Sequence, residues 1–296
     1  MSKPRRLQIY IFACLGILLI GLSGWLACNT LQPATPFDGQ RAYEDVLAQV
    51  AFGARTPGSA AHAQAIAYIQ QELENAGWKV QIQVTEWLGF SVQNIIASRS
   101  EVAPRIVVGA HYDSRILADQ DPGPGRSGAV PGANDGASGV AILLELARTL
   151  PSDSIPVWLV FFDAEDNGGL DNREWIMGSR AFVAALTEKP QAAVIVDMVG
   201  DADLNLYLER NSDAALTAEI WAQAAALGNG KNFIAALKHD LIDDHIPFLE
   251  AGIPAVDIID FDYPYWHTAA DTADKVSAQS LQAVGETLWA WIESQK

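Results

Sequence analysis

Beyond about residue 39, the chain alternates between amphipathic segments with helical apolar spacing and short, continuously apolar runs. The amphipathic segments predict helices at 40–51, 60–77, 137–150, 178–186, 213–227, 244–251 and 277–293. The apolar runs predict strands at 79–86, 93–98, 105–110, 156–162, 192–198, 204–208 and 254–260. Neither a repeat nor a second linker interrupts this order, so we predict one globular domain over residues 39–296.

Four of the predicted strands, RIVVGA, VWLVFF, AVIVDM and AVDIID, are apolar at nearly every position and rich in β-branched residues. Strands that expose one face to water alternate polar and apolar residues, whereas strands covered on both faces do not. The pattern therefore predicts the α/β class, with a mostly parallel central mixed sheet flanked by helices.

The first residues differ from the rest of the chain. Lys3, Arg5 and Arg6 precede an uncharged apolar run from Ile9 to Cys28, long enough to cross a bilayer. Basic residues on the N-terminal side keep that end in the cytoplasm and send the rest across the membrane. Residues 1–28 therefore predict an uncleaved signal anchor, a cleaved signal peptide or a lipoprotein signal ending at Cys28; a buried helix of the domain is the alternative. Residues 29–38 form a polar tether, and the domain is expected outside the cytoplasm, anchored to the membrane or secreted.

Composition narrows the partners of this domain. Both cysteines, Cys14 and Cys28, lie in the N-terminal segment, so the domain has neither disulfides nor thiolate metal ligands. Without the three basic residues of that segment, 16 Lys and Arg face 36 Asp and Glu, a balance of −20. Such a charge disfavours nucleic acid and anionic membrane surfaces as partners.

Polar residues gather where the predicted strands end. In open α/β sheets, ligands bind beyond the carboxyl ends of the strands, and in this chain five segments place an imidazole or carboxylate there or at a helix start. These residues are His111 and Asp113, Asp135, Asp163 with Glu165 and Asp166, Asp197, and His267. Imidazoles mixed with carboxylates are the ligands that zinc accepts when no thiolate is available.

Eight segments in order resemble a known family. They are ARTPGSAAH, GAHYDSR, PGANDGASGVAILLELA, FFDAED, GSRAF, VDMVGDAD, DDHIPFLEAGIPAVDI and YWHTAADT. Across nearly all of residues 50–293, the chain is similar to the zinc aminopeptidases with co-catalytic metals and to the animal-type glutaminyl cyclases that share their fold. The resemblance implies a zinc-exopeptidase-like fold.

The resemblance also implies roles for individual residues. It makes Asp135, Asp166 and His267 the ligands of one zinc and Glu165 the general acid/base. In the two-zinc peptidases, the positions of His111 and Asp197 bind a second zinc; in the one-zinc cyclases, the position of Asp197 is a hydrogen-bonding acid beside the catalytic Glu. One departure is Asp166, because most members have the longer Glu there.

Three features favour the cyclases. Asp197 could pair with Glu165 or Asp243 to share a proton, since close carboxylates cannot all ionise. Asp243 corresponds to a catalytic hydrogen-bonding acid, with the N-cap of the following helix as its alternative role. Trp266 corresponds to a wall of the glutamine pocket, although it could simply pack beside the metal. In contrast, the loop PGANDGASG and the retained His111 are peptidase-like.

Other residues receive weaker predictions. Trp175 and Asp244 are expected to contact substrate, with packing as the alternative for Trp175. His245 is expected to be a structural hydrogen-bonding residue, and Asp163 to lie in a turn or behind the ligands. His62 and His239 are expected at the surface.

The leading expectation is an enzyme that converts the N-terminal glutamine of peptides or proteins to pyroglutamate, with release of ammonia and one Zn²⁺. The alternative is a two-zinc aminopeptidase that releases N-terminal residues. The third is a binding protein that keeps the fold without catalysis.

Overall fold

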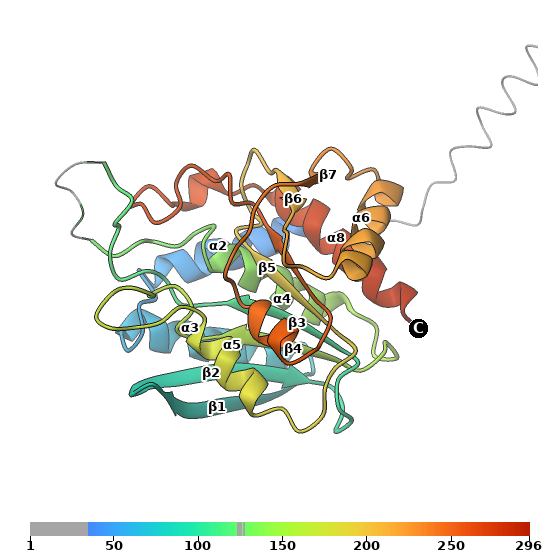
Figure 1. The fold of residues 1–296 in the computed structure, drawn as a ribbon, viewed down its shortest axis with the longest axis horizontal. Helices are drawn as coiled ribbons and strands as arrows, with labels where there is room; N and C mark the ends of the chain where they lie inside the picture. Colours follow the sequence, from blue (N-terminus) through green and yellow to red (C-terminus); the bar gives the residue numbers. More distant parts are fainter. Residues whose placement is uncertain (1–34, 123–125, 127) are drawn as a thin grey trace, which may run out of the picture. The chain divides into compact units, whose positions relative to one another are not determined.

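Six strands form one mixed sheet in the computed structural model, which describes residues 35–122, 126 and 128–296. The strand order is β1-β2-β4-β3-β5-β8 (Figure 1). The strands are β1 (Lys79–Trp87), β2 (Phe90–Ser98), β3 (Ile106–His111), β4 (Val157–Phe162), β5 (Ala192–Asp197) and β8 (Ala255–Ile259). β2 pairs antiparallel with both of its neighbours, β1 and β4, whereas β4, β3, β5 and β8 run parallel to one another.

Helices cover both faces of this sheet. They are α2 (Gly39–Ala51), α3 (Ala60–Asn75), α4 (Ala137–Thr149), α5 (Met177–Ala184), α6 (Ala214–Leu227), α7 (Ile246–Glu250), the 3₁₀ helix η2 (Ala273–Lys275) and α8 (Ala278–Ser294). The larger core joins α2, α3, α4, α6 and α8 to one face, and a smaller core lies under α5 and α7 on the other (Figure 1). Residues 36–296 form one compact unit.

The parallel strands alternate their side chains between these two cores. On β3, Val108 packs in the larger core, whereas Val107 packs in the smaller one with Phe182 of α5. Because both faces are covered, every residue of β3 and β5 is buried. This arrangement confirms the α/β class and explains why the strands read as unbroken apolar runs.

Glycines bring α4 close to the sheet. A side chain at Gly139 would place its Cβ 2.4 Å from the carbonyl oxygen of Val196 on β5. Gly136 has a φ of +93° immediately before α4, in the left-handed region that other residues rarely adopt. The helix therefore starts beside the carboxyl ends of the strands, directly after Asp135.

The structure contains the strand predicted at 204–208, as β6 (Leu206–Leu208), and adds a strand, β7 (Phe233–Leu237), that the sequence pattern did not predict. A short parallel pair joins β6 to β7. β7 was missed because most of it is exposed and pairs only with a three-residue strand, so it carries little apolar signal. The predicted membrane segment lies outside the described residues; within them, no helix combines the length and apolar character needed to cross a bilayer.

Candidate metal centre and active-site cleft

The carboxyl ends of the parallel strands bring the predicted site residues together. His111 ends β3, Asp197 ends β5, and the turn after β4 carries Glu165 and Asp166. Asp135 precedes α4, and His267 lies in the loop after β8. All six residues are more than nine-tenths buried by the packing around the sheet edge, which brings their polar atoms close to one another.

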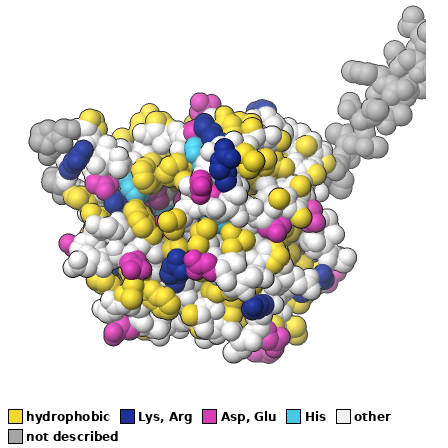
Figure 2. All heavy atoms as spheres, in the orientation of Figure 1, with side chains coloured by type: hydrophobic (Ala, Val, Ile, Leu, Met, Phe, Trp, Pro, Cys, Tyr) yellow, Lys and Arg dark blue, Asp and Glu magenta, His cyan; other side chains and the backbone are white. Residues whose placement is uncertain are grey.

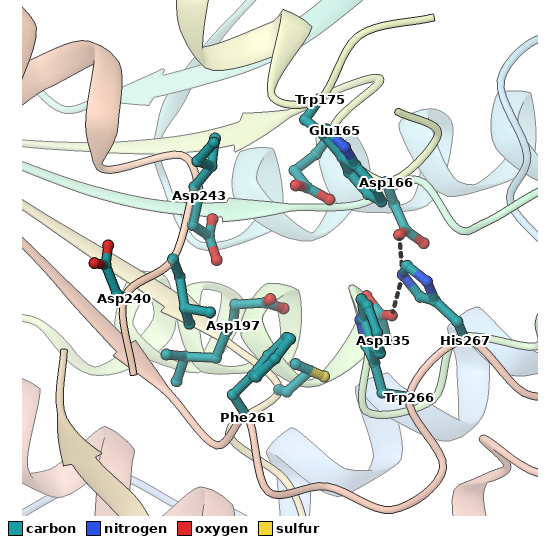
Figure 3. Close-up of a pocket in the computed structure, with 14 residues that line it drawn as sticks. Asp135, Glu165, Asp166, Trp175, Asp197, Asp240, Asp243, Phe261, Trp266 and His267 are labelled. Carbon is teal, nitrogen blue, oxygen red and sulfur yellow. Dashed lines mark hydrogen bonds and ion pairs between the residues drawn. The ribbon is translucent and has the colours of Figure 1, made fainter. Parts of the chain in front are cut away.

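Two groups of potential metal ligands share Asp135. In the first, His267 Nε2 lies 2.7 Å from Asp166 Oδ1 and 3.7 Å from Asp135 Oδ2 (Figure 3). In the second, His111 Nε2 lies 3.2 Å from Asp135 Oδ1 and 3.1 Å from Asp197 Oδ1. Ligands bound tetrahedrally to zinc at about 2.0–2.2 Å lie about 3.3–3.6 Å apart, a spacing that these distances bracket.

The first group contains buried carboxylate oxygens that lack a hydrogen-bond donor in the part of the chain that the structure describes, as a cation site would. Asp135 Oδ2 and Asp166 Oδ2 are buried and accept no hydrogen bond from the described residues. Burial and the nearby Asp135 charge raise the pKa of Asp166 to about 7, against the opposing effect of His267. Burial likewise raises the pKa of Asp197 to about 6, with His111 opposing it. A divalent cation would neutralise this concentration of buried negative charge.

A strained turn explains how neighbouring acids both reach the cleft. Successive strand residues point to opposite faces, so a continued β4 would separate Glu165 from Asp166. Ala164 instead has a φ of +54°, a conformation that is unfavourable for residues other than glycine. The carboxylate of Asp113 then accepts the backbone N–H groups of both acids, at 3.0 Å from Glu165 and 3.4 Å from Asp166.

Polar and aromatic groups orient His267. Asp119 Oδ1 lies 3.5 Å from His267 Nδ1, and Arg115 holds Asp119 through two hydrogen bonds of 2.8 and 2.6 Å. Trp175 lies parallel to the imidazole at 5.9 Å, and Trp266 stacks on it at 3.8 Å. A carboxylate behind a metal-binding histidine fixes the ring orientation and makes the free nitrogen a better ligand.

Backbone contacts fix Asp135. The carboxylate of Asp271 accepts the N–H groups of Asn134 at 2.9 Å and Asp135 at 3.2 Å. The fully buried Arg55 donates to the carbonyl oxygens of Tyr112, Pro131 and Gly132, and thereby ties the end of β3 to the loop that carries Asp135. The PGAND loop therefore presents its aspartate from a rigid backbone.

A cleft of about 260 Å³ opens over these residues. Figure 2 shows acidic and histidine side chains in the hollow, with hydrophobic side chains around it. Among the described residues, neither Lys nor Arg lines the cleft. The lining contains six carboxylates, which are Asp135, Glu165, Asp166, Asp197, Asp240 and Asp243. The volume lies at the small end of ligand pockets, which suits one end of a peptide rather than a bulky ligand.

Glu165 belongs to this acidic lining and lies between Asp243 and Asp166 in the view of Figure 3. Burial raises its pKa well above the ordinary range, His111 opposes the shift, and Asp243 and Asp166 raise the pKa further. A carboxyl group with a raised pKa can accept a proton and donate it again near neutral pH.

The cleft includes most of the predicted substrate residues. Trp175, Trp266 and Asp243 line it, whereas Asp244 is fully buried and does not. The geometry therefore favours a buried role for Asp244 over the predicted contact with substrate. The alternative N-cap role of Asp243 is wrong, because α7 begins at Ile246 with His245 as its N-cap.

Two further histidine predictions had different outcomes. His62 is not a surface residue: it is only 2% exposed, and its Nε2 lies 2.7 Å from Asp163 Oδ1. The prediction failed because the partner is a hundred residues away in sequence. His245 is fully buried, and its Nε2 lies 3.3 Å from Glu209 Oε2, but neither ring nitrogen makes a hydrogen bond to the described residues, so the predicted hydrogen-bonding role stays a prediction.

The residues that orient the ligands were not predicted by role. Asp113 and Arg115 lie within GAHYDSR, Arg55 within ARTPGSAAH, and Asp271 within YWHTAADT. Their presence in these segments was visible in the sequence. The partners that they hold in place belong to other loops and required the tertiary structure.

Comparisons with known proteins agree with this geometry. The family model described as Peptidase family M28 matches residues 94–292. A glutaminyl cyclase structure from Porphyromonas gingivalis is similar at a TM-score of 0.83 and 35% identity, covering 89% of this chain and 100% of that one. A leucine aminopeptidase precursor from Bacteroides thetaiotaomicron is similar at a TM-score of 0.84 and 32% identity, covering 89% and 99%.

A curated relative extends the same pattern. The glutaminyl-peptide cyclotransferase of Bothrops jararaca is 27% identical over 282 residues, which cover 80% of this chain and 75% of that protein. Relatives of both names, cyclase and aminopeptidase, therefore share this fold, and the family implies zinc as the metal. Because the family model spans more than half of the sequence, the chain belongs to peptidase family M28.

Proposed function

We propose that this protein is a zinc-dependent glutaminyl-peptide cyclotransferase that acts on peptide or protein N-termini. The observation that carries the proposal is the position of Asp243. It lines the cleft with Glu165 and Asp197, and it caps no helix. Three buried acids around one space suit a reaction that moves protons between two nitrogen atoms of the same substrate.

The cleft suits an amine terminus. Its carboxylates attract an ammonium group, and its lining offers no Lys or Arg to a substrate carboxylate among the described residues. Trp175 and Trp266 both line the cleft beside His267 and supply apolar surface, against which the methylene groups of a glutamine side chain can pack. A narrow apolar slot would hold the side chain folded back toward its own amine, and such positioning is the main requirement of an intramolecular attack.

The proton balance assigns the central role to Glu165. The α-amine nitrogen forms a bond to the side-chain amide carbon and loses a proton, while the bond from that carbon to its amide nitrogen breaks. Glu165 takes the proton from the attacking amine and gives it to the leaving nitrogen, which departs as ammonia. Asp197 and Asp243 stabilise the protonated forms by sharing hydrogen bonds with Glu165 as the charge moves.

Asp135, Asp166 and His267 would hold the zinc of this enzyme. When bound, the metal supplies polarisation of the substrate carbonyl. The protein side chains fix the approach of the amine, exclude water and carry the proton.

A two-zinc aminopeptidase is the second candidate, and one specific observation favours it. His111, Asp135 and Asp197 place ligand atoms close enough together to hold another metal. In that enzyme, Glu165 would deprotonate a water molecule instead of an amine, and the product would be a free amino acid.

Metal content measured together with product identity tests the proposal. We expect one zinc per purified chain and release of ammonia from Gln-peptides. The mass of the peptide product should be lower than that of the substrate by the mass of one ammonia molecule. Two zincs with amino-acid release from an aminoacyl reporter would establish the peptidase instead. Zinc-loaded protein with neither activity would point to a binding protein.

A matched pair of variants sharpens the metal count. His111→Ala removes a ligand of the second group only, so a one-zinc enzyme keeps its zinc. His267→Ala removes a ligand of the first group and is expected to lose it. If His111→Ala lowers the zinc content from two to one, the one-zinc proposal fails.

We also propose that residues 1–28 export the domain. The support is the order of basic and apolar residues in the sequence. Fractionation of cells that express the full chain, followed by alkaline extraction of membranes, separates an anchored from a released protein. Recovery of the activity in the cytoplasm would contradict export.

A further inference from the structure

A buried hydrogen bond joins α3 to the end of β4, outside the cleft. His62 Nε2 lies 2.7 Å from Asp163 Oδ1, and the two side chains are 3% and 1% exposed. The imidazole also stacks on Tyr112 at 5.1 Å between ring centroids, which fixes its orientation. Neither side chain lines the cleft, and neither belongs to a potential metal-binding group.

Asp163 is held from several directions. Its second oxygen, Oδ2, accepts the backbone N–H of Gln93 at 2.8 Å, and its own N–H donates to Asn94 Oδ1 at 3.0 Å. The neighbouring strand β2 therefore holds both its backbone and its carboxylate. With His62 on Oδ1, both carboxylate oxygens have a donor, which a buried carboxylate needs.

The position of Asp163 in the chain gives this arrangement its consequence. Asp163 directly precedes Ala164, the residue with a φ of +54°, and Glu165 and Asp166 follow. A strained conformation persists only where its surroundings over-determine it. Asp113 holds the far side of the turn through the N–H groups of Glu165 and Asp166, and the N–H groups of Met177 and Ile176 donate to the carbonyl oxygens of Ala164 and Glu165. Asp163 anchors the near side.

We propose that His62 and Asp163 form a positioning pair that fixes the 163–166 turn and thereby aims Glu165 and Asp166 into the cleft. His62 acts through Asp163 and touches no reacting group. The same turn supplies both the general acid/base and a zinc ligand, so the pair serves cyclase and peptidase chemistry alike. The inference therefore stands apart from the proposed function.

The competing explanation is that the pair simply fastens α3 to the sheet. A fastening role affects stability alone. A positioning role additionally affects the turnover rate and the zinc affinity, because small displacements of reacting groups and of the residues behind metal ligands each cost about 10- to 100-fold.

Three variants separate the contributions of the pair. His62→Phe keeps an aromatic ring on Tyr112 and removes the donor to Asp163. His62→Gln keeps a donor at the position of Nε2 and removes the ring. Asp163→Asn keeps the shape and turns an acceptor oxygen into an NH₂ group, which meets either His62 or the Gln93 N–H.

Asp45→Asn is the matched control. Asp45 is also a buried aspartate, 3% exposed, and it accepts hydrogen bonds from Arg148 at 2.6 and 2.8 Å and from Tyr68 at 2.6 Å. Arg148 lies eleven residues along α4 from Ala137, about 16 Å at 1.5 Å per residue. The control therefore weakens a buried pair of the same kind away from the cleft.

The zinc dissociation constant, measured by chelator competition, and kcat with the substrate of the wild-type protein are the readouts. We expect His62→Phe and Asp163→Asn to lower kcat about 10- to 100-fold with KM changed less than about threefold, and to weaken zinc binding about tenfold. His62→Gln is expected to retain most of both. Asp45→Asn is expected to lower the melting temperature alone.

Two results would overturn the proposal. One is that a folded His62→Phe protein keeps the kcat and the zinc affinity of the wild type. If His62→Phe does not fold, the same result with Asp163→Asn would overturn the proposal. The other is an equal loss of kcat or zinc affinity in Asp45→Asn, which would mean that general loosening is responsible. Zinc affinity requires no turnover, so it tests the pair even if the proposed cyclase reaction is not observed.

Discussion

Replacement of Glu165 by Gln should change activity and stability in opposite directions. Gln has the same shape as Glu but cannot carry a proton between nitrogen atoms. The contacts that hold the turn use the backbone of residue 165: its N–H donates to Asp113, and its carbonyl accepts from the N–H of Ile176 at 3.1 Å. The substitution therefore leaves the position of Asp166, and with it the zinc site, intact.

The loss of activity follows from the loss of the general acid/base. Such groups contribute about 10²- to 10⁴-fold, which corresponds to about 2.7–5.5 kcal/mol of the activation barrier. We expect kcat to fall by that factor in Glu165→Gln, with zinc content unchanged. Initial rates with a Gln-peptide, or with the aminoacyl reporter if that is the wild-type substrate, measure the effect.

The gain in stability comes from the same burial that makes Glu165 useful. Burial raises its pKa well above the ordinary range, His111 opposes this, and Asp243 and Asp166 raise it further, so the metal-free fold holds an unfavourable ionisable group. Removal of one such buried ionisable group should raise the free energy of unfolding by on the order of 1–3 kcal/mol. For a domain of this size, each kcal/mol shifts the melting temperature roughly 2–4 °C upward.

Thermal unfolding of both proteins in the presence of a chelator completes the test. Glu165→Asp is the control, because it keeps an acid one methylene away from its place and should be intermediate in rate. A Glu165→Gln protein within tenfold of the wild-type rate would remove Glu165 from its assigned role. A variant that lost activity and melted at a lower temperature would show that Glu165 is structural.

Three other predictions concern the metal, the aromatic wall and acid stability. Zinc at 100 times its dissociation constant should stabilise the metal-free protein by about 2.7 kcal/mol, seen as a rise in melting temperature that His267→Ala abolishes. Trp266→Ala should raise KM about tenfold, because the indole lines the cleft; an unchanged KM would exclude a substrate contact. Burial tends to raise the pKa of Glu209, but His245 and two backbone N–H groups lower it to about 2. Its stabilising effect is therefore present above about pH 4.5 and is lost as the pH falls from 4.5 toward 2, so melting temperatures of Glu209→Gln should depend less on pH in that range than those of the wild type.

The fold class could be predicted from the sequence because the buried strands and the helices that cover them each have their own pattern of apolar residues. Strands covered on both faces read as unbroken apolar runs such as VWLVFF, and the helices beside them keep their own spacing. The failures came where burial is slight: β7 pairs with only three residues and exposes most of its length. A strand with little buried surface has little reason to be apolar.

The ligands of the candidate site were also readable, because metal binding requires particular side-chain types at particular strand ends. The structure brings Asp135, Asp166 and His267 together in a group that could hold a metal, and their role as zinc ligands stays a prediction. The residues that orient them depend on contacts between distant loops. Asp271 holds the backbone beside Asp135, and Asp119 faces His267 across nearly 150 residues of sequence.

The turn after β4 shows which features the sequence determined and which required the tertiary structure. The sequence alone determined that FFDAED carries acids at a strand end, because hydrophobicity and residue type are properties of the chain. Only the tertiary structure decided that Ala164 takes a left-handed conformation, that Asp113 holds the following N–H groups, and that His62 reaches Asp163 from α3. A strained backbone needs partners that over-determine it, and those partners come together only when the chain has folded.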